Sequence, residues 1–191
     1  MLKTHVHYLC KNNYGAKVYK SVQKCNINSK FTFKLTQKPH MAFLIGEYEC
    51  TLDTKQRIRV PAGLIGQLTG DDTGKFVVTR GIDPCLYLYP QSEFYTEMDK
   101  VNLIQENSEE DRDYKNMFYS GTSILNIDSA ERILIPKLHL HHAGIVKDII
   151  MVCQKNKVVV WSMELFKEKY LKMTPNQFQQ LSEKVRSKYG I

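Results

Sequence analysis

Short apolar runs separated by turn residues recur along the chain, and this pattern is typical of β-hairpins. The first pair of runs covers residues 76–79 and 85–89, with Gly, Asp and Pro in the gap between them. The second pair covers residues 149–153 and 158–161. β-Branched and aromatic residues dominate all four runs, and such residues fit the pleated surface of a sheet. The pattern therefore predicts two hairpins, one in each half of the body.

A ten-residue motif precedes each hairpin and reveals an internal repeat. Residues Leu52 to Pro61 read LDTKQRIRVP, and residues Ile127 to Pro136 read IDSAERILIP. Both fit the pattern apolar-Asp-x-x-x-Arg-Ile-x-apolar-Pro. The terminal prolines suit the end of a strand and the first turn of a helix. Each copy is therefore predicted to run strand, turn, strand, short helix, strand, turn, strand.

The duplication itself predicts the architecture. One copy is too short to bury a large core, and its strand edges would be exposed. Two copies can pair their edges and share one core, so we expect a mainly β fold with short helices (α+β), built as a pseudo-twofold unit. The predicted boundaries are 1–42 for an N-terminal extension, 47–93 for module 1, 94–120 for a helical connector, 121–165 for module 2 and 166–191 for a C-terminal helical segment.

Helices are predicted outside the two copies, wherever Ser or Thr precedes a helix-compatible stretch. Such side chains accept hydrogen bonds from free N–H groups at a helix start, and acidic residues there meet the positive end of the helix dipole. The predicted helices are one from a Ser92 cap through Ile104, one after Ser108, one from a Ser162 cap to about Leu171, and a last one opened by Thr174-Pro175 with Phe178, Leu181 and Val185 on its apolar face.

Charge is distributed unevenly. The net charge of the whole chain is +7. Residues 1–40 contain eight Lys and no acidic residue, whereas residues 41–191 contain 19 basic and 20 acidic side chains, a net of −1. An argument for nucleic-acid binding by the body must therefore rest on local basic clusters and not on the overall charge.

Two interpretations fit the first 40 residues. They can serve as a basic arm that lies along phosphates. Alternatively, their Lys, Asn, Tyr, Phe and Ile residues, which have A/T-rich codons, indicate a leader translated in error. We expect Met41 to be the true start, with residues 1–40 absent or disordered in the cell.

Several classes of protein are disfavoured. No apolar run approaches the roughly 18 residues of a membrane-spanning helix, and no secretory signal is visible. The five cysteines are scattered without a Cys-x-x-Cys pair, which is typical of reduced thiols in a cytosolic protein. The chain has no phosphate loop or nucleophile elbow, and Cys85 lies in an apolar run. We therefore expect no enzymatic activity, no cofactor and no small-molecule substrate.

His139, His141 and His142 form the cluster that most resembles a metal site. His139 and His142 would share one helix face, but no carboxylate or cysteine stands at a compelling spacing beside them. Three ligands from one short segment rarely suffice for zinc. We expect one of these histidines to pack or cap and the others to lie at a helix surface, with no metal bound.

The Asp-x-x-x-Arg segments are the candidate functional sites. Asp53 and Asp128 can accept backbone N–H bonds and fix a tight turn. Arg57, Arg59 and Lys55 would then project from a short rigid loop, where arginine can match guanine and lysine can meet phosphate. In the alternative interpretation, Asp only caps the turn and Arg forms a salt bridge with it.

The second copy is predicted to be the poorer DNA reader. Ala130 stands where the first copy has Lys55, Leu134 replaces Arg59, and Glu131 would repel phosphate. We expect the first copy to dominate DNA contacts.

The sequence closely resembles the MraZ family of bacterial transcriptional regulators over roughly residues 43–170. The most specific match is the run Asp-Pro-Cys-Leu-Tyr-Leu-Tyr-Pro at residues 83–90. The matching stretches are 46–49 (GEYE), 52–57 (LDTKQR), 83–90 (DPCLYLYP), 128–132 (DSAER) and 142–145 (HAGI).

The resemblance implies an AbrB/SpoVT-like fold of two swapped-hairpin modules and a ring-like homo-oligomer. It implies binding to repeated double-stranded promoter sites, repression of the division and cell-wall gene cluster, including the protein's own promoter, and a cytoplasmic, nucleoid-associated location. The implied DNA-contacting residues are Arg57 and, beside it, Lys55, Arg59 and Arg132. The family often has Gly before the motif arginine, where this chain has Gln56 and Glu131.

Three functional hypotheses follow. The first is a sequence-specific DNA-binding regulator. The second is a protein-interaction module of antitoxin type with the same fold, although the tail here is basic and the tails of such proteins are usually acidic. The third is a metal hydrolase that uses the histidine cluster.

Overall fold

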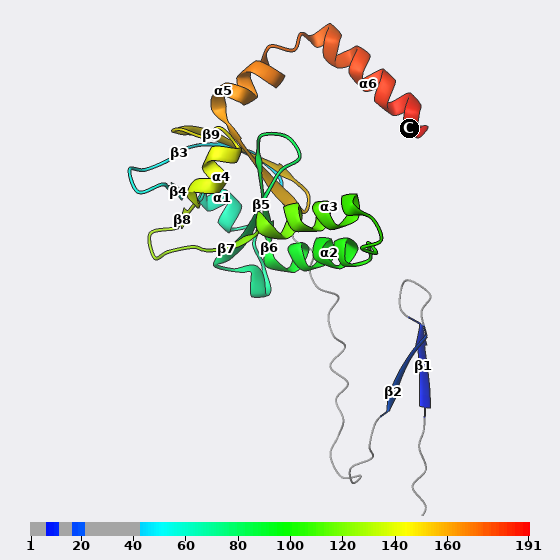
Figure 1. The fold of residues 1–191 in the computed structure, drawn as a ribbon. Coiled ribbons are helices and arrows are strands. Elements are labelled where there is room, and N and C mark those ends of the chain that lie inside the picture. The colour runs from blue at the N-terminus through cyan, green and yellow to red at the C-terminus, as the bar shows by residue number, and fades with distance from the viewer. Residues whose placement is uncertain (1–6, 12–16, 22–42) are drawn as a thin grey trace, which may run out of the picture. The chain divides into compact units, whose positions relative to one another are not determined.

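The computed structural model describes residues 7–11, 17–21 and 43–191 (Figure 1). Within the first 42 residues it describes strands β1 (His7–Lys11) and β2 (Lys17–Ser21), which pair antiparallel. The other residues of this segment lie outside the described part, and so does the expectation of a start at Met41. The segment and the body form separate units, and the body is considered by itself below.

The predicted repeat is confirmed by the order of elements in the body. Strand, strand, short helix, strand and strand occur twice, with two helices between the copies and further helices after the second. The first copy consists of β3 (Glu47–Thr51), β4 (Arg57–Arg59), α1 (Ala62–Ile65), the 3-10 turn η1 (Gly70–Asp72), β5 (Lys75–Arg80) and β6 (Leu86–Pro90). The second consists of β7 (Ser123–Asn126), β8 (Arg132–Leu134), α4 (Lys137–His142), β9 (Asp148–Gln154) and β10 (Lys157–Ser162).

The two copies interleave in one antiparallel sheet of strand order β3-β9-β10-β6-β5-β7. Exchanging each strand for its counterpart in the other copy gives the same order read backwards, so the sheet has a pseudo-twofold axis between β10 and β6. The first strand of each copy pairs with the other copy, β3 with β9 and β7 with β5. Edges that one copy would leave exposed are therefore covered by its partner copy.

The second strands of the copies, β4 and β8, form a separate two-stranded ladder. Ile58 lies opposite Ile133 in this ladder, and both side chains are fully buried. Alternation along β4 then places Arg57 and Arg59 on the outer side. The ladder, together with α1 and α4, covers one face of the large sheet, and the core between them includes Phe76 and Met151.

The opposite face of the sheet is covered by helices. Phe94 of α2 (Gln91–Asn102) stacks on Phe118 of α3 (Glu109–Ser120), with ring centroids 5.7 Å apart, and both rings pack beside Tyr89 of β6. Farther along this face, α5 (Met163–Phe166) adds Phe166 to a cluster around Trp161.

The helix caps are partly as predicted. Ser108 caps α3 in a capping box with Asp111. The prediction for Ser92 is wrong: α2 begins at Gln91 after Pro90, and its last residue is Asn102. The Ser92 hydroxyl donates to Asp72 instead.

The C-terminal segment also follows the prediction in outline. Ser162 precedes α5 but makes no cap hydrogen bond, and a π-helical turn, η2 (Lys167–Leu171), continues α5 to the predicted end. Thr174 and Gln177 form a capping box for α6 (Pro175–Tyr189). Among the described residues, no helix is long and apolar enough to cross a membrane.

Candidate nucleic-acid interface

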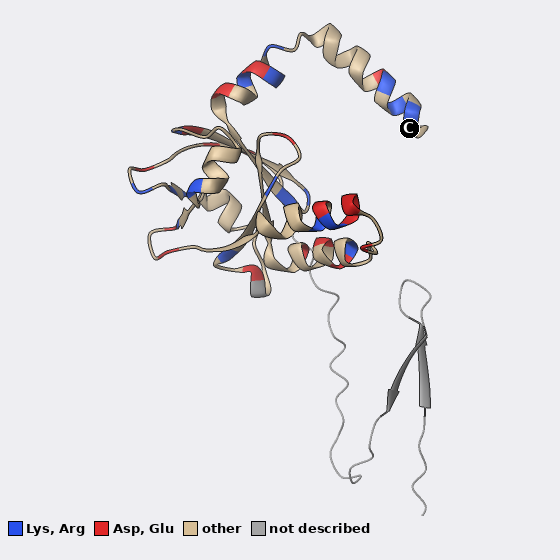
Figure 2. Cartoon of the chain, in the orientation of Figure 1, with Lys and Arg blue, Asp and Glu red and all other residues tan. Residues whose placement is uncertain are grey.

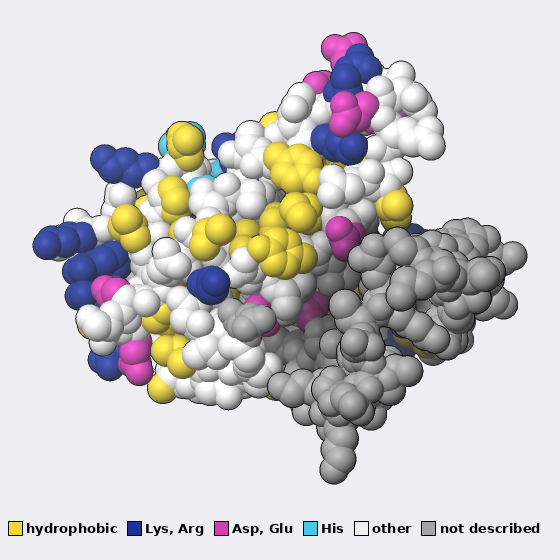
Figure 3. Space-filling model, turned by 90° about the horizontal axis from the view of Figure 1, so that it is seen from below, with side chains coloured by type: hydrophobic (Ala, Val, Ile, Leu, Met, Phe, Trp, Pro, Cys, Tyr) yellow, Lys and Arg dark blue, Asp and Glu magenta, His cyan; other side chains and the backbone are white. Residues whose placement is uncertain are grey.

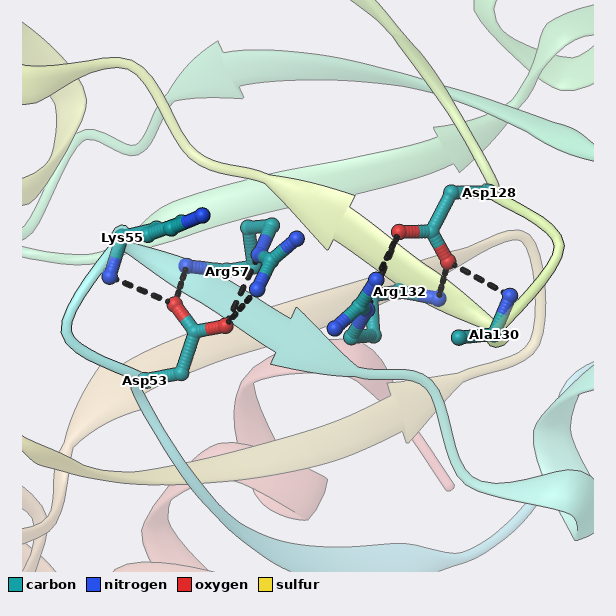
Figure 4. Close-up of polar contacts among 6 residues, drawn as sticks. All are labelled: Asp53, Lys55, Arg57, Asp128, Ala130 and Arg132. Atoms are coloured by element: carbon teal, nitrogen blue, oxygen red, sulfur yellow. Dashed lines mark hydrogen bonds and ion pairs between the residues drawn. The ribbon is translucent and has the colours of Figure 1, made fainter.

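The turn between β3 and β4 is built around one carboxylate (Figure 4). Asp53 Oδ1 accepts hydrogen bonds from the backbone N–H groups of Lys55 at 2.8 Å and Arg57 at 2.9 Å. Asp53 Oδ2 accepts from the Arg57 side chain, with Nε at 2.7 Å and Nη2 at 2.6 Å. One side chain thus fixes the turn and holds the guanidinium group by one edge.

The turn between β7 and β8 repeats this geometry. Asp128 Oδ1 accepts from the backbone N–H groups of Ala130 at 2.8 Å and Arg132 at 2.9 Å. Asp128 Oδ2 is 3.0 Å from Arg132 Nε and 2.9 Å from its Nη2. Figure 4 shows the two turns side by side, related by the approximate twofold axis of the β4–β8 ladder.

Each turn places a non-glycine residue in the left-handed region of backbone conformation. The φ angle is 61° at Gln56 and 59° at Glu131. These are the two positions where the resemblance leads one to expect Gly, which adopts such angles freely. The bonds to the Asp carboxylates therefore maintain the turn against a strain on the order of 1 kcal/mol at each position.

Both carboxylates have a lowered pKa. The side-chain hydrogen bond from Arg57, followed by the bond from its backbone N–H, lowers the pKa of Asp53 to about 2. The side-chain bond from Arg132 likewise lowers the pKa of Asp128. A lowered pKa means that the stabilisation is complete above the ordinary value of 3.8 and is lost as the pH falls towards 2. Both ion pairs are therefore intact at neutral pH.

The cations of the site differ in their exposure. The Arg59 side chain is 78% exposed, whereas those of Arg57 and Arg132 are 26% and 34% exposed. Lys55 is exposed at the tip of the first turn. The salt bridge of the alternative interpretation is thus present in both copies, and it orients the two less exposed guanidinium groups.

The ladder brings the two copies into contact at this surface. Arg59 lies opposite Arg132 in the β4–β8 register, and Arg57 lies opposite Leu134. Arg59 Nη2 also reaches Glu131 Oε2, which belongs to the second repeat of the same chain, at 3.3 Å. This contact between copies was missed from sequence, because only the register of β4 and β8 brings the two side chains together. Lys and Arg side chains gather at this end of the body, at the left of Figure 3.

The three histidines of α4 lie in different surroundings. His139 is buried, and its Nε2 lies 2.7 Å from the carbonyl oxygen of Gly121, while burial lowers its pKa. His142 Nε2 lies 3.1 Å from the carbonyl oxygen of Gly81, and His141 is exposed. In the part of the chain that the structure describes, no group of His, Cys, Asp or Glu could hold a metal ion.

Cys85 is a core residue, as its apolar run predicts. Its side chain is 1% exposed. Burial, more than the nearby Asp83 carboxylate, raises its pKa to about 11. The thiol is therefore neutral near pH 7, which is unsuited to nucleophilic attack.

The comparisons with known proteins all indicate one family. A family model described as "MraZ protein, putative antitoxin-like" matches residues 43–116 and 118–186, one match for each copy. A protein of Cytophaga hutchinsonii named Transcriptional regulator MraZ is 41% identical over 144 residues, which cover 75% of this chain and 95% of that protein.

Two further relatives carry the same name. The Clostridium beijerinckii protein is 39% identical over 124 residues, covering 65% of this chain and 84% of its own length. The Flavobacterium psychrophilum protein is 32% identical over 157 residues, covering 79% of this chain and 99% of its own length. Together with the two matched repeats, these similarities establish that the chain belongs to the MraZ family.

Proposed function

We propose that this chain is a transcriptional regulator that binds double-stranded promoter DNA through the β3–β4 turn. The observation that carries the proposal is the Asp53-held guanidinium of Arg57, which stands beside the exposed cations Lys55 and Arg59. The relatives named as transcriptional regulators support the same function. It is a binding function and requires no chemical step.

The turn suits base reading in the major groove. Asp53 occupies Nε and one Nη2 donor of Arg57, and a guanidinium group has five N–H donors in a fixed plane. The remaining donors can form a fork to the O6 and N7 atoms of guanine. Because the carboxylate already fixes the side chain, little rotamer entropy is lost on binding. Lys55 at the tip and Arg59 along the strand would meet phosphates.

One turn offers few contacts, so several must act together. We infer a ring-like homo-oligomer in which β3–β4 turns from several subunits face repeated sites on one side of the DNA. Once one turn binds, the effective concentration of the next rises, and affinity accumulates. Repression of the division and cell-wall gene cluster, including the protein's own promoter, would follow from occupation of promoter DNA in the nucleoid.

A mobility-shift assay tests this function. The purified protein is titrated against the DNA immediately upstream of its own gene and against a scrambled duplex of equal length and composition. We expect tighter binding to the upstream DNA. We also expect the logarithm of the association constant to fall linearly with the logarithm of the salt concentration, with a slope of about −0.9 for each phosphate contacted. Equal affinity for both duplexes would contradict sequence-specific regulation.

Glu131 is expected to limit DNA affinity. Its carboxylate neutralises Arg59 and adds negative charge beside the proposed phosphate contacts. Glu131→Gln should therefore strengthen binding about two- to fivefold at low salt, an effect that fades as salt screens the charge. The matched variant Gln56→Glu, which gives the first turn the acidic residue of the second, should weaken binding. Fluorescence anisotropy on one duplex measures both, and a weaker Glu131→Gln complex would refute this role.

The second candidate function is a protein-interaction module of antitoxin type. The family description, which includes the words antitoxin-like, favours it. It predicts a stoichiometric protein partner after mild purification from the native host. Such a partner, combined with no preference for the upstream DNA, would replace the regulator proposal.

A further inference from the structure

The last helix, α6, carries an apolar stripe that no part of the described chain covers. Phe178, Leu181, Val185 and Tyr189 follow one another at spacings of three and four residues and therefore share a helix face. Their exposed fractions are 64%, 46%, 44% and 67%, and α6 has no buried residue. Single exposed apolar residues are common on protein surfaces, but a continuous stripe marks an interaction face.

Charge divides α6 into two halves. Residues 175–182 carry no charged side chain, so the first half presents Phe178 and Leu181 in a neutral setting. The second half carries Lys184, Arg186 and Lys188 and a single acidic residue. Figure 2 shows this concentration of Lys and Arg at the C-terminal end of the helix.

Helix α3 has the reverse arrangement. Glu110, Asp113, Tyr114 and Met117 lie at helical spacing on one face, and all four are exposed. The acidic residues are in the first half of the helix, as Figure 2 shows, and the apolar ones are in the second. The surrounding segment 91–120 holds eight acidic and three basic side chains, a net charge of −5.

A pocket of about 440 Å³ lies beside α3. Much of its lining is apolar or aromatic: Tyr89, Val101, Tyr114, Met117 and Phe118. Charged groups of both signs, Arg80, Lys157 and Glu97, also line it, so it is the apolar part of the lining that suits an anchoring side chain. The neutral first half of α6 offers apolar side chains for this part.

We propose that α6 of one copy docks antiparallel on α3 of a second copy of this chain. In this orientation Phe178 and Leu181 lie over Met117 and the pocket, and the basic end of α6 lies over Glu110 and Asp113. Antiparallel packing also opposes the two helix dipoles favourably.

We take the occupant to be a second subunit because the described part of the chain leaves both faces uncovered and their charges are complementary. Each subunit carries one donor helix, α6, and one acceptor face, on α3. The contact is therefore heterologous and can close into a ring. The inference rests on the homo-oligomer of the proposed function and names the surfaces that would join its subunits.

Charge exchange between full-length chains tests this contact. The donor variant carries Lys184→Glu and Lys188→Glu, and the acceptor variant carries Glu110→Lys and Asp113→Lys. Each alone should weaken self-association about tenfold or more, because like charges would face each other. An equimolar mixture should restore the wild-type assembly, since each altered helix then meets its complementary face. Sedimentation velocity measures the mass of each sample.

The outcomes separate the alternatives. Restoration in the mixture supports docking between copies. Restoration only when all four substitutions are in one chain means that α6 docks on its own α3, and this would overturn the proposal. If both variants assemble like wild type, α6 and α3 are not the interface, although the oligomer itself remains. A wild-type protein that is monomeric at all concentrations would refute the oligomer and this interface together.

Matched controls exclude general charge effects. Lys172→Glu lies before α6, and Asp99→Lys lies on α2, and both positions are exposed. Neither should change the sedimentation of the oligomer. Binding of a short duplex with a single site should also be unaltered in the donor and acceptor variants, since the β3–β4 turn is untouched.

Discussion

Replacing Arg57 with alanine is expected to weaken binding to the upstream promoter DNA about 10- to 100-fold, the usual effect of removing a bidentate guanine contact. The guanidinium group is held by Asp53 Oδ2 at 2.6 Å and 2.7 Å before DNA arrives. The variant therefore loses a prearranged fork. Fluorescence anisotropy at fixed salt measures the change.

The second copy provides the control for this substitution. Arg132 makes the same ion pair with Asp128, in a turn of the same geometry. Arg132→Ala should therefore change the free energy of unfolding about as much as Arg57→Ala does. It should weaken DNA binding much less, because Ala130, Glu131 and Leu134 surround it. Equal losses of affinity in both variants would show that the substitutions act through the turns and not through base reading.

Replacing Ile58 with alanine is expected to destabilise the whole body by about 2–5 kcal/mol, as truncation of a fully buried side chain does. Ile58 lies opposite Ile133 in the β4–β8 ladder, where both side chains are 0% exposed. Strands of the two repeats pair with each other in this ladder and at three places in the large sheet, β3 with β9, β10 with β6 and β5 with β7. A cavity in the first copy should therefore weaken the second copy equally.

Urea unfolding tests this shared core with two signals. The single Trp, Trp161, is buried in β10 of the second copy, while circular dichroism reports the strands and helices of both. The two transitions should coincide in the wild type and in Ile58→Ala. Ile124→Ala is the matched control, since that side chain is 61% exposed and its loss should cost no more than about 0.5 kcal/mol. Separate transitions for the two signals would mean that the copies fold independently.

Much of the fold was predictable because its determinants are local. The apolar runs, the repeated motif and the caps at Ser108 and Thr174 each depend on neighbouring residues, and each produced the predicted element. Ser92 shows the limit of such reasoning. Pro90 already supplies the fixed φ angle at the N-cap and starts the helix two residues earlier, and Ser92 instead bonds to Asp72, twenty residues away.

The candidate site was predictable in its residues but not in its arrangement. The Asp-x-x-x-Arg spacing predicts a turn fixed by Asp53, and it leaves open whether Arg57 points to the carboxylate or to solvent. In the structure the Arg57 side chain points to the Asp53 carboxylate. The pairing of Arg59 with Glu131 depends on register between segments 72 residues apart, and no local pattern contains that information.

The most direct measurement of base reading compares wild type with Arg57→Lys. Lysine keeps the positive charge and can still pair with Asp53, but it lacks the planar fork. The ratio of the dissociation constants for scrambled and upstream DNA is measured for both proteins at one salt concentration. We expect this ratio to fall about tenfold in Arg57→Lys, while affinity for scrambled DNA changes less than about twofold. An unchanged ratio would contradict sequence reading by the β3–β4 turn.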